Sequence, residues 1–494
     1  MPLVGVRRQT ATGQADTQRV RMAPYGQRAR GFVGMFALHF LLAAAAAVGA
    51  EALPSAAWAY AALAIYLSLL LGLLRTSPAT FLLFIPLLAN RVTEFISGAA
   101  IESGAYMVET TTYGHATGAF TRLLLIYILY MLTATAAVEA MWPRLRVLFR
   151  DAPERWEKQA PLIWRGLLIV MLAASLYLIR LGINNGFPLF STIDRFSYLE
   201  QVDSPIYSAW MTNRLVLVPF VGALFSLPSY RLRSGLLLLW LLSLSIIFGE
   251  KFGSILLILS IFGIPAGLVH IANDRKIPIN IIAGVSGAIV VITIPAVLIA
   301  YGALTNFDAA AQRYGQRVAL QGQLWYVTDN RSLSATNFDD RALYADISTW
   351  MKPGEQSATK VGTRFGLYYV MQPFTASRLL GWTMEGGGGF IGSLYPYLLM
   401  TTGIVGLLII SSLIALYHAV LMRMLASSFA HSNWIAAVLY GRVMSSFYAT
   451  YSTGYLWNIF GIKTLATLFV ALFFSWEFNR PLSTSRRWLK QSSG

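Results

Sequence analysis

A short polar segment late in the chain carries two arginines and a glutamine at helical spacing. Arg313, Arg317 and Gln321 recur every fourth residue, so in a helix they share one face. Two guanidinium groups spaced in this way can bind neighbouring phosphoryl groups bidentately, which lysine does less well. Asn306 and Asp308 precede them, where an N-cap and a carboxylate favour a helix. By spacing alone, a solvated helix with surface arginines fits equally well.

Charged residues also occur within or beside apolar segments. Arg91 and Glu94 are three residues apart in one such segment, so we expect them to form a structural ion pair. Glu385 precedes four consecutive glycines, and a carboxylate beside such a loop could accept a proton from a substrate hydroxyl. A flexible linker with an incidental glutamate explains that pattern as well. Three further cations border apolar segments and are candidates for function or for snorkelling to the interface: Arg195, Arg214 and Lys251.

Sequence motifs of metal and nucleotide chemistry are absent from the chain. It has no D-x-D, H-E-x-x-H or Walker-type loop, and its five histidines are scattered. The absence of cysteine excludes disulfides, thiolate catalysis and cysteine-bound metal. We therefore expect chemistry without a metal or another cofactor.

The composition indicates a membrane protein. Of the 494 residues, 56% are apolar and 12% are charged, whereas an average soluble protein has about 25% charged residues. The net charge of +16 raises the question of nucleic acid as a partner. Apolar stretches interrupt the chain almost everywhere and leave no solvated domain for a basic patch, so we exclude that class.

Apolar segments long enough to cross a bilayer recur along the sequence. Crossing about 30 Å of hydrocarbon requires roughly 20 residues of helix. This rule predicts an all-α polytopic fold with about twelve transmembrane helices, at residues 31–50, 56–74, 79–98, 120–141, 162–183, 214–227, 235–249, 253–271, 277–301, 395–418, 433–451 and 455–478. The chain then divides into a basic tail (1–30), nine spans (31–301), a large helical loop (302–394), three spans (395–478) and a second basic tail (479–494).

The distribution of lysine and arginine predicts which side of the membrane each loop faces. Short cytoplasmic loops retain positive charge. Here the cations gather in both tails and in alternate loops, near residues 75, 144–158, 231–233, 275–276 and 423. Both termini are therefore predicted to be cytoplasmic. The segments 184–213 and 302–394 fall on the opposite side, and their cations need another explanation because long loops cross the membrane whatever their charge.

An apolar channel walled by many helices and capped by an arginine-bearing loop suits an amphiphile with a lipid tail and a diphosphate head. A polyprenyl-diphosphate-linked sugar fits that description. The diphosphate is already a good leaving group, so cationic side chains could stabilise its developing charge without a metal. A sugar hydroxyl would be the nucleophile.

The pattern of about twelve spans with a large outer loop late in the chain resembles the Wzy-type O-antigen and capsular polysaccharide polymerases, which are relatives of the O-antigen ligases. The local similarities are Gly186-Phe187-Pro188 followed by Arg195, Gly249-Glu250-Lys251, the Arg313, Arg317 and Gln321 pattern, and Gly403-Ile404-Val405-Gly406.

The resemblance implies a GT-C-type glycosyltransferase of the bacterial inner membrane, with both termini cytoplasmic and its active face periplasmic. It would move a growing glycan from undecaprenyl diphosphate to the non-reducing end of a lipid-linked repeat unit. Its partners would be these two lipid-linked oligosaccharides, membrane lipids and a chain-length regulator. The resemblance assigns diphosphate and glycan contacts to Arg313 and Arg317, then to Arg195, Arg214, Lys251, Arg364 and Gln321.

Two alternatives stay open at this point. One is an O-antigen ligase, although no predicted outer histidine stands where a ligase-like pattern would place one, which leaves Glu385 as the candidate base. The other is a transporter or flippase of lipid-linked oligosaccharide. Carriers of this size often consist of two similar halves, whereas this sequence shows no half-repeat and has its long insertion on the outer side.

Overall fold

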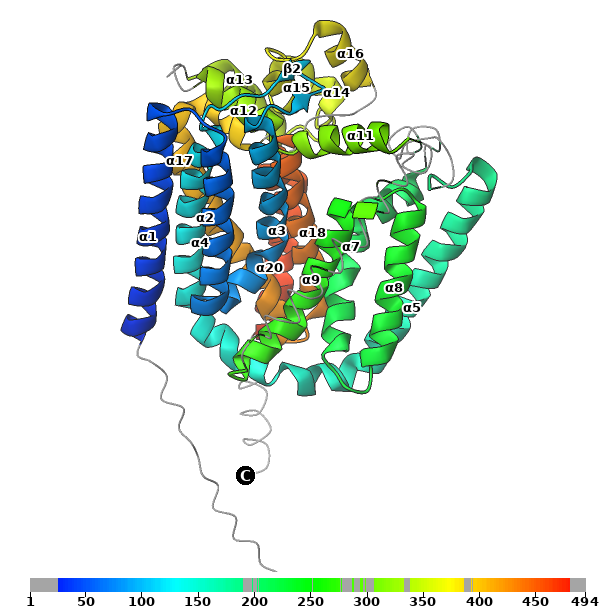
Figure 1. Ribbon diagram of the computed structural model, residues 1–494. Helices are drawn as coiled ribbons and strands as arrows, with labels where there is room; N and C mark the ends of the chain where they lie inside the picture. The colour runs from blue at the N-terminus through cyan, green and yellow to red at the C-terminus, as the bar shows by residue number, and fades with distance from the viewer. Residues whose placement is uncertain are drawn as a thin grey trace, which may run out of the picture.

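Long helices make up most of the computed structural model (Figure 1), which describes residues 25–189, 204–250, 252–275, 306–332, 338–385 and 394–479 and isolated residues between these ranges. The long helices are α1 (Tyr25–Ala52), α2 (Ala57–Thr76), α3 (Pro78–Glu102), α4 (Ala119–Arg150), α5 (Ala152–Asn185), α7 (Pro205–Phe225), α8 (Arg231–Ile247), α9 (Phe252–Ala272), α17 (Leu394–Ala430), α18 (Trp434–Thr453) and α20 (Ile462–Asn479). The shorter elements are β1 (Tyr106–Met107), β2 (Thr112–Tyr113), α11 (Phe307–Ala319), α12 (Gln323–Ser332), α13 (Asp340–Trp350), α14 (Ala358–Val361), α15 (Leu367–Met371), α16 (Ser377–Glu385) and α19 (Trp457–Phe460).

Within the described ranges, nine helices are long and apolar enough to cross a membrane. They are α1 to α5, α7, α9, α17 and the segment Trp457–Ser475, which covers α19 and most of α20. The prediction of an all-α polytopic membrane protein is confirmed. Two further expected spans form helices that fall outside this group: α8 has only 17 residues, and α18 contains an arginine and many hydroxyl side chains. The expected span 277–301 lies, apart from isolated residues, outside the described residues.

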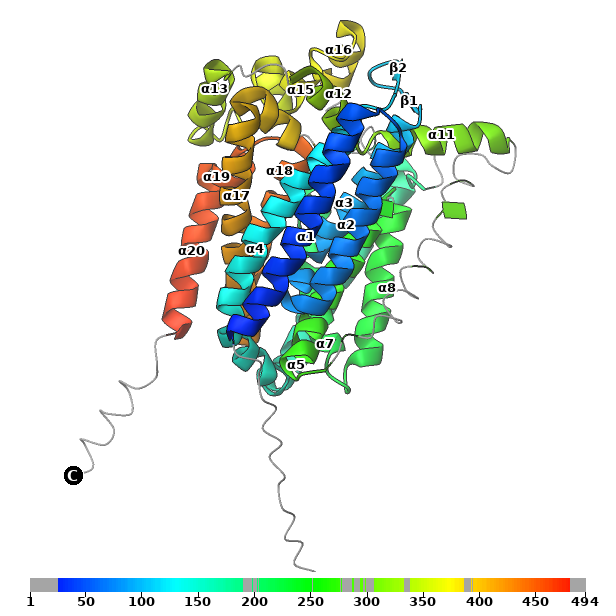
Figure 2. The same ribbon diagram turned by 60° about the vertical axis from the view of Figure 1, so that its left-hand side comes forward.

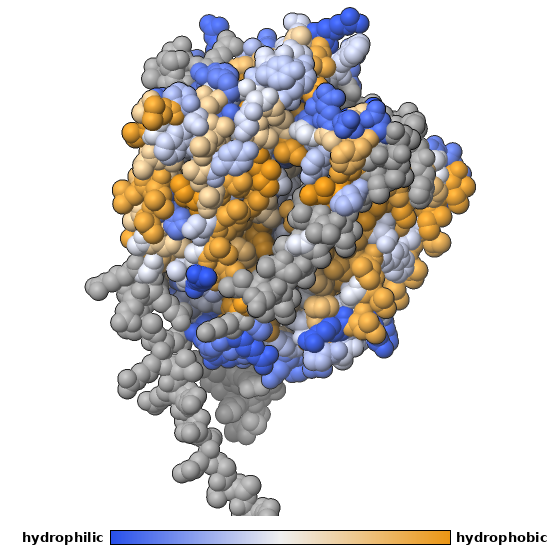
Figure 3. All heavy atoms as spheres, in the orientation of Figure 1, coloured by the Kyte–Doolittle hydropathy of each residue, from blue (hydrophilic) through white to orange (hydrophobic). Residues whose placement is uncertain are grey.

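The two ends of the helical bundle differ in what they carry. Helices α11 to α16, which we call the capping layer, lie together with the β-hairpin at one end, whereas α1 begins and α20 ends at the other end (Figures 1 and 2). The α4–α5 corner and the start of α8, which hold predicted cytoplasmic cations, lie at that second end. Between the ends, one face of the molecule shows a broad apolar band (Figure 3). The helix ends that carry predicted cytoplasmic cations thus lie at one end of the bundle, as the alternation of positive loops predicts.

Close packing inside the bundle depends on small residues. In lipid the hydrophobic effect does not bring helices together, so they associate mainly through van der Waals contacts at short distance. A side chain at Gly98 of α3 would place its Cβ 2.3 Å from the ring of Phe120 on α4. At Gly222 of α7 a Cβ would lie 2.2 Å from the backbone oxygen of Phe262 on α9. These glycines let α3 approach α4 and α7 approach α9 closely enough for direct packing.

Helix α17 is bent near its start. Gly403 has φ 65° and ψ −177°, a conformation that only glycine adopts easily, and it separates the segment 394–402 from the long remainder of the helix. The expected span 395–418 is therefore confirmed at its start, but it contains a bend and ends too early. Its first two turns precede the bend, and the helix continues to Ala430 because apolar residues persist through that end.

The capping layer is fixed to the bundle by polar contacts at several points. Arg122, near the start of α4, donates from Nη2 to Asp329 Oδ2 of α12 at 2.6 Å and from Nε to the same oxygen at 3.0 Å. The Asp339 amide, just before α13, donates to the Thr401 carbonyl at 3.0 Å. Ser97 of α3 donates to the Ala319 carbonyl at the end of α11 at 2.9 Å. The position of α11 is thus tied to the membrane helices.

Candidate functional site: an arginine helix and a buried arginine

The predicted arginine helix exists and lies across the capped end of the bundle (Figure 1). Asn306 caps it by accepting the Ala309 amide on Oδ1 at 3.0 Å, as the sequence predicts. Arg313 and Arg317 are both exposed, four residues apart. Hydrophilic side chains gather over α11 on the face shown in Figure 3. The helix therefore presents two guanidinium groups to solvent beside the membrane-spanning helices.

Gln321 departs from the prediction. Helix α11 ends at Ala319, so Gln321 lies in the turn before α12 and does not continue the arginine face. The chain turns here because Gly322 docks tightly: its amide donates to Ser97 Oγ at 2.8 Å, and a Cβ at this position would come within 2.8 Å of the Phe120 ring. A helix extended through residue 322 would lose this docking.

Glu109 is the residue at this face that sequence reasoning missed. It lies in the β-hairpin, where the Gln323 amide group donates to its carboxylate and Arg317 interacts with it electrostatically. Burial raises the pKa of Glu109 to about 7, although Gln323 and Arg317 both act to lower it. A carboxyl group that titrates near neutral pH beside a cation is suited to general acid–base chemistry. Its sequence context, between two tyrosine-bearing strands, carries no motif that could have indicated this.

A second cation lies inside the bundle. Arg91 of α3 donates from Nη1 to Glu94 Oε2 at 2.8 Å, and the Arg91 side chain is only 3% exposed. Three tyrosine rings surround its guanidinium group, with the Arg91 Cζ atom 5.3 Å from the centroid of Tyr127, 5.6 Å from Tyr395 and 5.1 Å from Tyr451. The predicted pairing of Arg91 with Glu94 is confirmed. We call these five residues the Arg91 cluster.

The Arg91 cluster lies beneath the turn that ends α11. A Cβ added to Gly392, which has φ +80°, would lie 3.5 Å from Glu94 Oε1, 3.7 Å from the Gln321 carbonyl oxygen and 3.9 Å from Arg91 Nη1. Arg91 itself is eleven residues before the end of α3 at Glu102, about 16 Å along the helix at 1.5 Å per residue. The structure thus brings Gln321 close to Arg91, a neighbour that sequence spacing does not predict.

Hydrogen bonds extend from this cluster toward the interior. Tyr127 donates to Glu94 Oε2 at 2.5 Å, and Tyr451 donates to the Tyr130 hydroxyl at 2.8 Å. Tyr130 in turn lies 2.7 Å from Nδ1 of His418. Two short hydrogen-bonded chains, joined by the contact of Arg91 with the Tyr451 ring, therefore connect α3, α4, α17 and α18.

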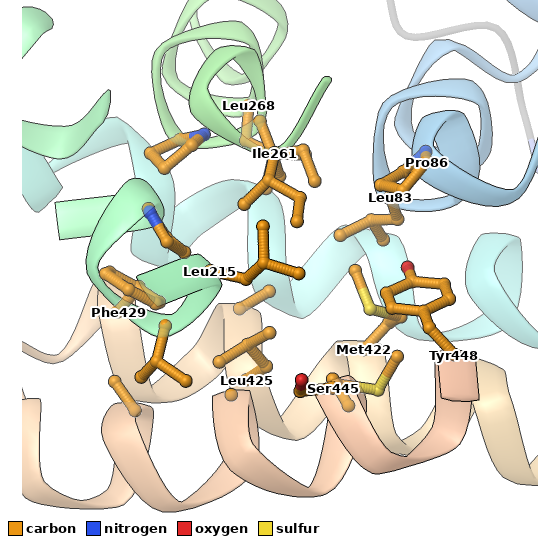
Figure 4. Close-up of a pocket in the computed structure, with 18 of the residues that line it drawn as sticks. Leu83, Pro86, Leu215, Ile261, Leu268, Met422, Leu425, Phe429, Ser445 and Tyr448 are labelled. Atoms are coloured by element: carbon orange, nitrogen blue, oxygen red, sulfur yellow. The ribbon is translucent and has the colours of Figure 1, made fainter. Parts of the chain in front are cut away.

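A small apolar cavity of about 60 Å³ lies between α3, α7, α9, α17 and α18 (Figure 4). Its walls are aliphatic and aromatic, with Leu83, Leu215, Ile261 and Met422 among the lining residues and Tyr448 at one side. Tyr448 also packs edge-to-face on His418, with ring centroids 5.7 Å apart. The lining is suited to apolar groups rather than polar ones.

The other predicted site residues belong neither to the arginine helix α11 nor to the Arg91 cluster, or they lie outside the described residues. Arg214 is buried on α7, where it pairs with Glu250 and donates to the Met211 carbonyl at 2.7 Å. Arg364 is exposed and donates to the Val361 and Lys360 carbonyls at 3.1 Å each. Glu385 is exposed at the end of α16. Arg195 and Lys251 lie outside the described residues. Among the residues that the structure describes, no group of three His, Cys, Asp or Glu side chains could hold a metal ion.

Comparison with known proteins finds a match between part of the chain and a family model without an assigned activity. Residues 360–468 match the model of a family of unknown function (DUF6418). No curated protein and no solved structure matches the chain. The matched segment runs from the capping layer through α17 and α18 into α20, so it includes Tyr395 and Tyr451 of the Arg91 cluster but not α11.

Proposed function

We propose that this protein is a membrane-embedded glycan polymerase. It transfers a growing glycan from a polyprenyl diphosphate to a second lipid-linked oligosaccharide, at the capped end of the bundle and without a metal. The observation that carries the proposal is the position of α11. Its two exposed arginines lie beside the membrane-spanning helices, at the end opposite the basic corners. A lipid diphosphate in the bilayer would present its head group at that height.

The reaction needs a group that takes a proton as well as cations that hold the leaving group. A hydroxyl oxygen of the acceptor sugar attacks the anomeric carbon of the donor, and the bond from that carbon to the diphosphate oxygen breaks. The diphosphate leaves with its electron pair, and Arg313 and Arg317 stabilise its charge. The hydroxyl proton passes to a carboxylate. Glu109 beside Arg317 is better suited to this step than Glu385, because burial brings its pKa to about 7.

The roles of Arg313 and Arg317 can be tested by the pattern of surface glycan in a deletion strain complemented with Arg313→Ala or Arg317→Ala. We expect chains shortened to a single repeat unit, with normal amounts of inserted protein. Arg341→Ala, which removes another exposed arginine of the capping layer, serves as the matched control and should leave chain length unchanged. Normal chain lengths in both test variants would rule out the proposed role.

The pattern of surface glycan on a gel, measured in the deletion strain, also separates the alternative functions. Loss of a ligase leaves bare core with accumulated lipid-linked polymer, and loss of a flippase traps repeat units on the cytoplasmic side. Either pattern in the deletion strain would replace the polymerase proposal.

The role of Glu109 predicts a pH dependence. In isolated membranes supplied with lipid-linked repeat units, polymer formation should fall as the pH drops through about 7, because the carboxylate form of Glu109 is then lost. Glu109→Gln should reduce the rate roughly 100-fold or more above pH 7, as expected for the loss of a general base, and the difference should shrink below pH 7, where the original protein also lacks the carboxylate. Glu385→Gln is the comparison: if it abolishes activity and Glu109→Gln does not, the proton acceptor is Glu385.

A further inference from the structure

The Arg91 cluster holds hydrogen-bond donors that remain unused. Within the part of the chain that the structure describes, Arg91 Nε and Nη2 and the Tyr395 hydroxyl are buried and have no hydrogen-bond partner. Glu94 engages only Nη1. Buried polar groups are normally satisfied, and a guanidinium group within a membrane is costly. Neither the Glu94 ion pair nor the three tyrosine rings around the guanidinium group gives these three atoms a hydrogen bond.

The unfilled atoms are donors of the kind that bind phosphate. Nε and Nη2 form one edge of the planar guanidinium group, and this edge donates two parallel hydrogen bonds to a phosphate or a carboxylate. The Tyr395 ring lies 5.6 Å from Arg91 Cζ, so its hydroxyl belongs to the same surroundings. We propose that Arg91 and Tyr395 form a second anion-binding site, inside the bundle, that takes the phosphate head of a lipid.

The location favours a lipid over a free anion. The Gln321 carbonyl and the Gly392 backbone cover the cluster from the capped end, whereas the helices that hold it, α3, α4, α17 and α18, are part of the bundle. The identity of the lipid rests on the proposed function. A polymerase that joins two lipid-linked glycans must hold two diphosphates, and the structure has two separate cation sites for them.

Salt dependence distinguishes the two cation sites. Arg313 and Arg317 are exposed, so their attraction for an anion weakens as salt screens it. Arg91 is buried and paired with Glu94, so a ligand there is held by directed hydrogen bonds that salt screens little. Binding through the Arg91 cluster should therefore persist at an ionic strength that removes binding through α11.

The test measures the binding of farnesyl diphosphate to the purified full-length protein in detergent at about 0.5 M salt, where the Debye length is only a few ångströms. Farnesol and inorganic pyrophosphate are the comparison ligands. Tyr395→Phe removes one unpartnered hydroxyl and leaves the ring, so it should preserve the fold. We expect it to weaken binding roughly 10-fold or more, the value of one hydrogen bond to a charged group. Tyr417→Phe is the matched control, because it too removes a buried hydroxyl with no partner among the described residues.

Unchanged affinity in Tyr395→Phe, or an equal loss in Tyr417→Phe, would overturn the inference. Pyrophosphate binding as tight as that of farnesyl diphosphate would overturn the assignment to a lipid. The outcome is independent of the glycan assay: Tyr395-dependent binding in a protein that makes no polymer would refute the proposed function alone. Normal polymer without Tyr395-dependent binding would refute this inference alone.

Discussion

The contact between Arg122 and Asp329 predicts an asymmetry between two substitutions. Asp329 is 1% exposed on α12, and burial raises its pKa to about 6 even though Arg122 lowers it. Relative to the ordinary value of 3.8, this means that ionised Asp329 costs the fold about 3 kcal/mol, at about 1.4 kcal/mol per pKa unit. The desolvation of Asp329 therefore exceeds the attraction of its partner. Removing the Arg122 cation should therefore destabilise the fold, whereas removing the charge of Asp329 should not.

Arg122→Met should destabilise the docking of α12 by about 1.4 kcal/mol for each pH unit above 6, up to about 3–5 kcal/mol at high pH, because it leaves a buried carboxylate without its partner. Since 1.4 kcal/mol corresponds to a factor of ten, amide hydrogen exchange in α12 should accelerate about 100-fold or more. Mass spectrometry measures this acceleration over residues 323–332. The exchange rates are first corrected for their intrinsic pH dependence. As the pH falls through 6, Asp329 becomes protonated in both proteins and the difference should shrink.

Asp329→Asn is the matched control and should leave the exchange of α12 within about tenfold of the original protein. Arg122 keeps other partners in this variant, because it also contacts Glu51 and donates to the Thr117 carbonyl at 2.9 Å. If Asp329→Asn accelerates exchange as much as Arg122→Met, attraction outweighs desolvation and the reasoning fails. A difference that grows at low pH would refute it equally.

Two further predictions concern the capping layer and the bend in α17. Gly366→Ala should lower thermal stability much more than Gly403→Ala. Both residues combine a positive φ with an extended ψ, a backbone conformation that costs about 1–3 kcal/mol for alanine. Only at Gly366 does the new Cβ also meet another ring, 2.1 Å from Tyr455. Equal losses in a melting assay in detergent would contradict this. Burial raises the pKa of Asp346 to about 6, so ionisation of this group weakens the fold as the pH rises from about 4 to 6 and remains unfavourable above. Asp346→Asn should therefore match or exceed the original stability at pH 8, and a clear loss there would show that the charged form is needed.

Local sequence patterns predicted the helices well because their causes are local. Twenty apolar residues in succession specify a membrane helix without reference to the rest of the chain. Within the residues that the structure describes, nine of the expected spans meet that description. Asn306 caps α11 through a hydrogen bond to an amide three residues away, and Arg91 reaches Glu94 across a single turn. The alternation of positive loops predicted which helix ends lie together.

Other features depended on contacts between distant segments. Spacing predicted that Gln321 would share a face with Arg313 and Arg317, but the tight docking of Gly322 on Ser97 and Phe120 ends the helix before it. The surroundings of Glu109 come from Gln323 and Arg317, more than 200 positions later in the chain. No local pattern contains that information.

The sequence by itself determined a polytopic helical membrane protein with an arginine helix at one end, because hydrophobic length, charge alternation and helix capping act over short distances. Tertiary structure alone decided that three tyrosines from α4, α17 and α18 surround Arg91, and that the turn after α11 lies over it. The physical reason is that a buried cation takes its environment from whichever helices pack around it, and that packing is a property of the whole bundle.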